Sequence, residues 1–312
     1  MPDIVVMFFV LGLVAGLLKS DLDIPKAAYD TLSLLLMLTI GLKGGMVLHG
    51  SLAWDLAVEL VMIAMLGALI PLLVFPVLLK LAGAEAENAA SLAAHYGSVS
   101  AGTFAVALAY VDSMGLVTDP QVTLYLVMLE LPAILVSLYI YRKFFAGEVK
   151  PGSQSELWHE TFTNRGVVLL VGGVIIGFMY GPQQGAAVTE LLTGAFKAVL
   201  ALFLLEMGLT AADTLSPMPW KKWRLLVFAL IAPPCLSLLG MGAGMALGLA
   251  TGSVLILATL TASASYIAAP AAIRTAIPKA DIGLAMLMSL GITFPFNVIV
   301  GIPLYHYIIG LL

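Results

Sequence analysis

The sequence predicts an all-α integral membrane protein with ten transmembrane helices in a five-plus-five inverted repeat, in which helices 4 and 9 are broken. Three observations lead to this prediction: an apolar composition, ten long apolar segments, and a Ser-rich interruption that occurs once in each half. Hydrophobic residues make up 61% of the 312 residues and charged residues 10%, whereas a typical soluble domain has about 25% charged residues. This composition argues against a soluble globular protein.

The apolar segments give the expected helices. An uncharged run such as residues 60–79 is long enough, as a helix, to cross the ~30 Å hydrocarbon core of a bilayer. The only extended polar stretch divides the segments into five and five, so we assign residues 1–146 to a first repeat, 147–165 to a linker and 166–312 to a second repeat. The ten segments are 3–19, 26–42, 54–82, 86–112, 121–146, 166–182, 187–210, 221–249, 253–277 and 281–311.

The distribution of basic residues predicts the orientation in the membrane. All Lys and Arg residues except Lys43 and Lys197 fall in alternate loops on one side of the expected helices. Basic residues are retained on the cytoplasmic side. We therefore expect both termini outside the cytoplasm and the 147–165 linker inside. The N-terminus lacks the basic start of a signal peptide, so the first segment is expected to remain as a span.

Several function classes find no support in the sequence. The single cysteine, Cys235, excludes an intrachain disulfide, and no Cys/His cluster suggests a metal site. A calculated isoelectric point of about 5.5 gives no sign of nucleic-acid binding. No pairing of nucleophile and base favours an enzyme, although an intramembrane enzyme or a receptor stays a remote alternative.

Three landmarks recur in the same order in both halves. Residues 40–43 resemble 207–210, the pair Ser98 and Ser100 matches Ser263 and Ser265, and Pro132 matches Pro295. This order indicates a duplication. Because each half contains an odd number of expected spans, the second copy enters the membrane upside down.

The two Ser-rich interruptions, residues 96–103 and 261–270, are the main candidate site. Buried backbone groups in a bilayer must be paired, so Ser, Gly and Pro interrupt helices only where they line a cavity or a packed site. Half-helix N-termini suit an anion and C-termini suit Na⁺. The alternative is that small residues only allow close helix packing. The expected anion-binding residues are Ser98, Ser100, Gly102, Thr103, Ser263, Ser265, Tyr266 and Pro270.

A cation site is expected on the fifth and tenth helices. Glu130 lies in the middle of its expected span, where a carboxylate is costly enough to indicate function. Thr293 and Asn297 occupy the matching part of the tenth span. The alternative for Glu130 is a hydrogen bond to a neighbouring helix.

Four other polar residues have interpretations of their own. His95 adjoins the first interruption, where packing is favoured over a pH-sensing role. Lys197, placed inside the seventh span, is expected to extend toward an interface, and Glu206 is left open. Arg274 is either an anchor on the cytoplasmic side or a residue that holds the leaving anion.

Six strings of this sequence together resemble the sodium-dependent bicarbonate transporters of the cyanobacterial type. They span most of the chain, at residues 40–46, 97–103, 130–133, 202–209, 263–265 and 273–278. The resemblance implies a core domain of helices 3–5 and 8–10 and a gate domain of helices 1, 2, 6 and 7. It also implies a homotrimer, elevator-like transport and, in some members, inhibition by a PII-like protein.

This chain departs from the family pattern in the second interruption. Tyr266 stands where the pattern has Asp, and the triplet at 269–271 reads Ala-Pro-Ala where the pattern has Gly-Pro-Pro. The first departure removes an acidic Na⁺ ligand of the family pattern, unless Glu130 supplies it. The departures therefore bear on how Na⁺ is bound and on which anion is carried.

The sequence therefore indicates a secondary transporter in the plasma membrane of a bacterium, surrounded by lipid, that imports a small anion together with Na⁺. Bicarbonate is the anion by resemblance, Na⁺ is the coupling ion, and no other cofactor is expected. A Na⁺-coupled carrier of organic anions, similar to bile-acid transporters, is the alternative.

Overall fold

The computed structural model describes residues 4–50, 54–145, 165–216 and 218–312, and every element in these ranges is a helix. Six of its helical segments are long and apolar enough to cross a membrane, which confirms the prediction of an all-α membrane protein. The ten-helix inverted repeat stays a prediction, and the 147–164 part of the expected linker lies outside the described residues. The helices are α1 (Ile4–Leu17), α2 (Lys26–Leu48), α3 (Trp54–Lys80), α4 (Ala86–Gly97), α5 (Ala101–Ser113), α6 (Val122–Phe144), α8 (Arg165–Gly194), α9 (Phe196–Thr214), η1 (Trp220–Lys222), α10 (Trp223–Ala246), α11 (Thr251–Thr261), α12 (Ala268–Ala276), α13 (Ile282–Met286), η2 (Leu287–Thr293), α14 (Phe294–Phe296), η3 (Asn297–Gly301) and α15 (Ile302–Ile309).

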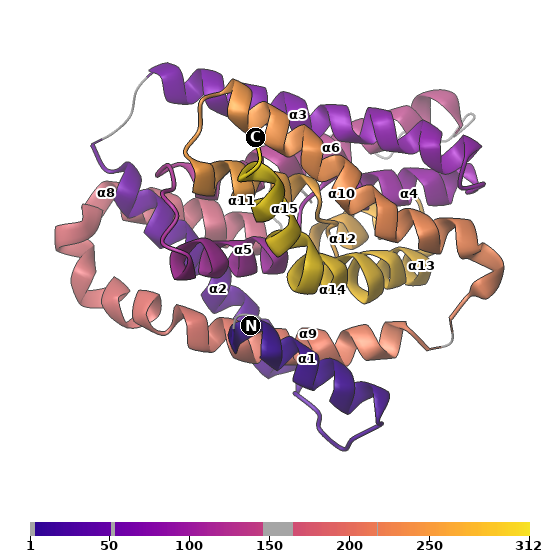
Figure 1. Cartoon of the computed structure of the whole chain (residues 1–312), viewed down its shortest axis with the longest axis horizontal. Coiled ribbons are helices and arrows are strands. Elements are labelled where there is room, and N and C mark those ends of the chain that lie inside the picture. The colour runs from indigo at the N-terminus through magenta and orange to yellow at the C-terminus, as the bar shows by residue number, and fades with distance from the viewer. Residues whose placement is uncertain (1–3, 51–53, 146–164, 217) are drawn as a thin grey trace.

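Both predicted interruptions are present, and the two broken helices run antiparallel through the interior of the molecule (Figure 1). The first is α4 and α5, and the second is α11 and α12. At one end, the N–H of Asp281, just beyond α12, donates to Asn88 Oδ1 of α4 (2.8 Å). At the other end, the N–H of Gly252 in α11 donates to the carbonyl of Val117, just beyond α5 (2.9 Å). The two breaks therefore meet midway between these ends.

The boundary between the sixth and seventh expected helices lies later than the sequence indicated. Helix α8 runs to Gly194, and only Gly181 within it has a non-helical backbone, with φ 63° and ψ −178°. This glycine kinks the helix, and Pro182 then starts a new helical stretch, a position that suits proline. Lys197 consequently lies in the first turn of α9 and not in the middle of a helix, as the expected segment 187–210 placed it.

The expected tenth helix is continuous but partly π-helical. Segments η2 and η3 lie between α13 and α15, on either side of α14. Pro295 and Pro303 each remove a backbone donor and displace the carbonyl one turn earlier, which favours such local widening of a helix. The polar residues Thr293 and Asn297 fall at the two ends of α14.

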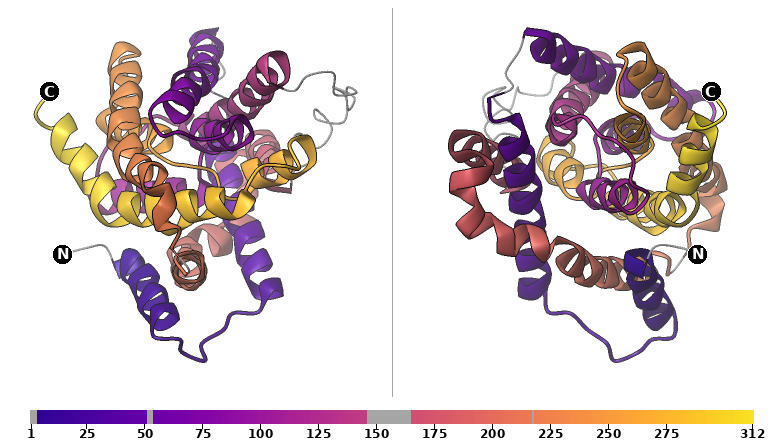
Figure 2. Two further views of the ribbon diagram at one scale, coloured as in Figure 1. Left: turned by 90° about the vertical axis from the view of Figure 1, so that its right-hand side faces the viewer. Right: turned by 60° about the vertical axis from the view of Figure 1, so that its left-hand side comes forward.

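Small residues form the contacts of two helix pairs, α1 with α9 and α2 with α8 (Figure 2). A Cβ atom on Gly12 would lie 2.0 Å from the carbonyl oxygen of Leu205, and one on Gly208 would lie 2.3 Å from that of Phe9. In the other pair, a Cβ on Gly45 would lie 2.1 Å from the Val174 oxygen. Only glycine permits backbones to come this close, as in other membrane helix pairs.

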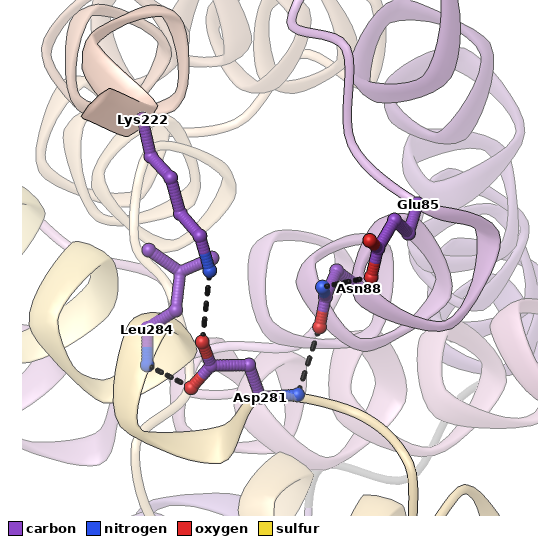
Figure 3. Close-up of polar contacts among 5 residues, drawn as sticks. All are labelled: Glu85, Asn88, Lys222, Asp281 and Leu284. Atoms are coloured by element: carbon purple, nitrogen blue, oxygen red, sulfur yellow. Dashed lines mark hydrogen bonds and ion pairs between the residues drawn. The ribbon is translucent and has the colours of Figure 1, made fainter. Parts of the chain in front are cut away.

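A polar network joins α4, η1 and α13 at one end of the broken helices (Figure 3). Asp281 caps α13 by accepting from the Leu284 N–H (2.9 Å), and Lys222 Nζ donates to its other oxygen (2.9 Å). Partial burial pushes the pKa of Asp281 upward, but these two donors outweigh it and hold the pKa below its usual range. Asn88 accepts from the Asp281 N–H and donates to Glu85 (3.4 Å).

We expect Asn88→Ala to destabilise the protein more than Lys222→Ala. The first change leaves the part-buried Asp281 N–H without its acceptor, which costs about 1–3 kcal/mol. The second breaks an ion pair whose side chains are 42% and 44% exposed, and such pairs contribute roughly 0–1 kcal/mol. Thermal unfolding in detergent should show the larger decrease in Tm for Asn88→Ala, and the reverse order would contradict this account.

Candidate functional site

The two interruptions are joined by reciprocal backbone hydrogen bonds. The N–H of Ser100 donates to Ser263 Oγ (2.9 Å), and the N–H of Ser265 donates to the carbonyl of His95 (2.7 Å). Ser100 Oγ also caps α5 by accepting from the N–H and the hydroxyl of Thr103 (3.0 and 2.9 Å). Four of the predicted anion-site residues therefore lie together at the place where the breaks meet.

Two further hydroxyls at this place have no hydrogen-bond partner among the described residues. They belong to Ser98 and Tyr266, which are 0% and 6% exposed. The Tyr266 hydroxyl lies against Gly102, where a Cβ atom would come within 2.1 Å of it. Gly102 is thus needed for the close approach of this ring to the N-terminus of α5. An unpaired buried hydroxyl is costly, which marks the place as a site for a polar ligand.

Glu130 lies in the central chamber, a cavity of about 30 Å³ beside the two breaks. It is 7% exposed and makes no hydrogen bond or ion pair with any part of the chain that the structure describes. It is the only ionisable carboxylate among the lining residues, so the chamber carries a negative charge when Glu130 is ionised. The chamber is lined by Ser33, Leu34, Met37, Val99, Ser100, Ala101, Leu126, Glu130, Ser265, Tyr266, Ile267 and Ala268.

Thr293 and Asn297 lie outside the central chamber. Thr293 donates to the carbonyl of Ala229 (2.8 Å), and its oxygen lies 2.7 Å from the hydroxyl of Tyr96. Asn297 donates to the carbonyl of Ala262 (2.8 Å) and accepts from Tyr305 (2.8 Å). Asn297 thus contacts the second break at Ala262, whereas Thr293 contacts α10 and the end of α4. Binding of a cation by either residue stays a prediction, and it would have to compete with these contacts.

A cavity of about 560 Å³ lies next to the chamber, and Tyr266 and Ile267 line both. We call it the Arg274-side cavity. Its wall includes the cations Lys26 and Arg274, the carboxylates Asp23 and Glu206, and Pro270, the eighth predicted anion-site residue. Pro270 therefore lines this cavity, while the other seven lie at the breaks themselves.

A third cavity, of about 430 Å³, is lined by Lys43 and Lys197. Lys197 forms an ion pair there with Asp112 at the end of α5 (2.7 Å). The two basic residues that the sequence set apart from all others thus share one cavity, and Lys26 and Arg274 share a different one. This grouping agrees with the expected orientation, which itself stays a prediction.

Comparison with known protein families decides the class of this site. Residues 4–310 match the family model of the Na⁺-dependent bicarbonate transporter superfamily. The chain belongs to this superfamily. No curated protein matches the chain. The resemblance inferred from the six strings is therefore confirmed, and the protein is a transporter rather than an enzyme.

Membership in the Na⁺-dependent bicarbonate transporter superfamily gives the site a chemical interpretation. Sodium is a hard cation that oxygen ligands suit, and the chamber offers the Glu130 carboxylate together with Ser hydroxyls. The N-termini of α5 and α12 both begin at the breaks, where their N–H groups favour an anion. Groups that suit a cation and groups that suit an anion therefore lie close together at the breaks.

Sequence reasoning missed Ser33 on α2 as a chamber residue. The packing role of His95 stays a prediction, since its buried Nε2 has no hydrogen-bond partner among the described residues. Ser33 is 4% exposed and lines the same chamber as Glu130. It is a buried Ser in a long apolar helix, which is a weak signal because small polar residues are common in such helices. His95 is fully buried, with Nδ1 2.7 Å from the carbonyl of Ser91.

Proposed function

We propose that this protein is a symporter that imports bicarbonate together with Na⁺. The observation that carries the proposal is the meeting of two half-helix N-termini and unpaired hydroxyls with a buried, unpaired carboxylate. The anion would bind at the breaks between Ser98, Ser100, Gly102 and Thr103 of one half and Ser263 and Ser265 of the other, next to Tyr266. Sodium would bind in the central chamber next to Glu130.

Coupling of the two ions follows from the repulsion between the bound anion and the ionised Glu130. An anion at the breaks and the ionised Glu130 repel each other across a low-dielectric region. A sodium ion in the chamber removes this repulsion and favours the anion, and by reciprocity the anion raises the affinity for Na⁺. Each ion would therefore bind poorly without the other, which is the requirement for symport.

The movement that we propose is an elevator. Helices α1, α2, α8 and α9 would form the gate domain, and α3–α6 together with α10–α15 would form the core domain. Support comes from the close glycine contacts within the α1–α9 and α2–α8 pairs and from the hydrogen bonds that join the broken helices in the interior. The core would carry both ions past the gate.

The proposed setting is the plasma membrane of a bacterium, with both termini outside and the Arg274-side cavity open to the cytoplasm. The basic residues of the alternate loops support this orientation. A homotrimer is part of the proposal by resemblance. Inhibition by a PII-like protein would involve the cytoplasmic side, where much of the linker lies outside the described residues.

Uptake of radiolabelled bicarbonate into proteoliposomes tests the proposed function. We expect uptake with an inward Na⁺ gradient and little uptake with an equal K⁺ gradient. Bicarbonate uptake that is equal with both gradients would overturn Na⁺ coupling. No bicarbonate uptake by folded protein would overturn the choice of anion.

A carrier of larger organic anions is the second candidate. The size of the Arg274-side cavity favours it, because about 560 Å³ lies within the range of sites for drug-sized ligands. Competition separates the two candidates. Strong inhibition of uptake by organic carboxylates would favour the second, and indifference to them would favour bicarbonate.

Ser98→Ala and Ser263→Ala should have different effects on stability but similar effects on uptake. The Ser98 hydroxyl has no partner in the described part of the chain, so its loss should leave Tm unchanged and weaken anion binding. The Ser263 hydroxyl accepts from the Ser100 N–H. Its removal should weaken anion binding and also lower the free energy of unfolding by about 1–3 kcal/mol. Unchanged uptake by Ser98→Ala would remove this serine from the site.

A further inference from the structure

Tyr266 lies between the central chamber and the Arg274-side cavity, and with Ile267 it lines both. Its side chain is 6% exposed. The ring packs edge-on against Phe294, with 5.5 Å between the centroids and an interplanar angle of 79°. The chamber has room for about two water molecules, whereas the neighbouring cavity has ample room for a displaced ring. A planar anion of four heavy atoms is too large for this chamber unless a side chain in its wall moves.

The Tyr266 hydroxyl occupies the N-terminus of α5. A Cβ on Gly102 would lie 2.1 Å from this oxygen, and the backbone of Gly102 and the side chain of Ser100 lie near it. The hydroxyl nevertheless has no well-formed hydrogen bond with the described residues, and neither has the nearby Ser98 hydroxyl. A weakly held, electron-rich oxygen thus sits where the helix end favours an anionic oxygen.

We propose that Tyr266 is a movable plug that determines access and affinity for the anion. Its hydroxyl occupies the position of an anion oxygen at the N-terminus of α5, and its ring turns into the Arg274-side cavity when the anion enters. The hydroxyl is then a competitor of the anion rather than one of its ligands. The identity of the anion rests on the proposed function, but the plug itself does not.

Thiol labelling tests the plug without any transport measurement. The probe residue is Ser33→Cys in the chamber, in protein whose exposed Cys235 is replaced by Ser. The reagent is a membrane-impermeant methanethiosulfonate. We expect labelling to be slow with Tyr266 and at least about tenfold faster with Tyr266→Ala, since the ring between the two spaces is then removed. Equal rates would overturn the plug.

Gly102→Ala provides a second test that keeps the tyrosine. Its Cβ meets the far end of the Tyr266 side chain, so the ring should be displaced and labelling of the Ser33→Cys thiol should become faster. Adding Tyr266→Phe removes the atom that clashes and should restore slow labelling. Fast labelling in the Gly102→Ala/Tyr266→Phe protein would show that the faster labelling of Gly102→Ala does not come from displacement of the Tyr266 hydroxyl. The proposal would then fail.

Kinetics then test the competition. We expect Tyr266→Phe to lower the KM for bicarbonate about 2- to 10-fold, the scale of one hydrogen bond. An unchanged KM would overturn the competitor role. A higher KM would also overturn it, because it would show that the hydroxyl is a ligand of the anion. Tyr29→Phe is the matched control, because Tyr29 lines only the Arg274-side cavity of the two. If the wild-type protein takes up no bicarbonate, the proposed function fails and the labelling results still decide the plug.

Discussion

Glu130→Gln is expected to reduce Na⁺-dependent uptake at least about tenfold and to remove most of its dependence on Na⁺. The substitution keeps the size of the side chain and removes the charge from the central chamber. Two unit charges 4 Å apart interact by about 4 kcal/mol at an effective dielectric constant of 20. Desolvation of the ion offsets part of this energy, and a factor of ten requires only about 1.4 kcal/mol.

Initial rates of uptake at a series of Na⁺ concentrations measure this effect. Glu206→Gln is the matched control, because Glu206 lines the Arg274-side cavity and has a hydrogen bond from Thr210 (3.2 Å). We expect the control to keep its dependence on Na⁺. The cation site would have to be placed elsewhere if Glu130→Gln kept the wild-type KM for Na⁺, and Thr293 and Asn297 would then become the next candidates.

Gly173→Leu is expected to cause the largest loss of folded protein. A Cβ at this position would lie 2.9 Å from the carbonyl oxygen of Leu38 and 3.1 Å from the Cα of Gly41. These are backbone atoms of α2, which cannot turn away as a side chain can. The pair α2 and α8 would have to separate along its whole contact, and overpacking of this kind costs about 1–3 kcal/mol or more.

The adjacent Gly172 provides a matched control. A Cβ on Gly172 would meet no atom within 4 Å, so Gly172→Leu changes the same helix by the same number of atoms without a clash. The yield of monodisperse protein and its Tm in detergent should fall for Gly173→Leu and stay near wild type for Gly172→Leu. Similar losses in both variants would mean that helix propensity, rather than the glycine contact, explains the effect.

The sequence predicted those features of the fold that bilayer chemistry makes obligatory. Breaks at residues 98–100 and 262–267 could be located because Ser-rich interruptions recur at matching places in the two halves, and the backbone groups that such interruptions free must be paired in a bilayer. The end of α8 could not, because a single glycine with positive φ let the helix resume after Gly181. Local composition does not reveal whether a chain turns away or continues after such a kink.

The candidate site was predicted unevenly for a similar reason. Ser100, Ser263 and Ser265 came from a repeated pattern. The structure bonds the Ser100 N–H to Ser263 Oγ and the Ser265 N–H to the carbonyl of His95. The membership of Ser33 in the chamber depends on how α2 packs against the breaks, which no periodicity in the sequence reports. The separation of Thr293 and Asn297 from Glu130 likewise depends on helix rotation, which the partly π-helical last span changes.

The reciprocal bonds between the interruptions also bear on how the protein is made. A chain emerging from the ribosome inserts its N-terminal part first. The Ser100 N–H then has no acceptor until Ser263 has been synthesised and inserted, and the carbonyl of His95 waits equally for Ser265. The region where the two breaks meet is therefore completed only late in biogenesis, and a chain truncated before residue 263 would lack both of these bonds.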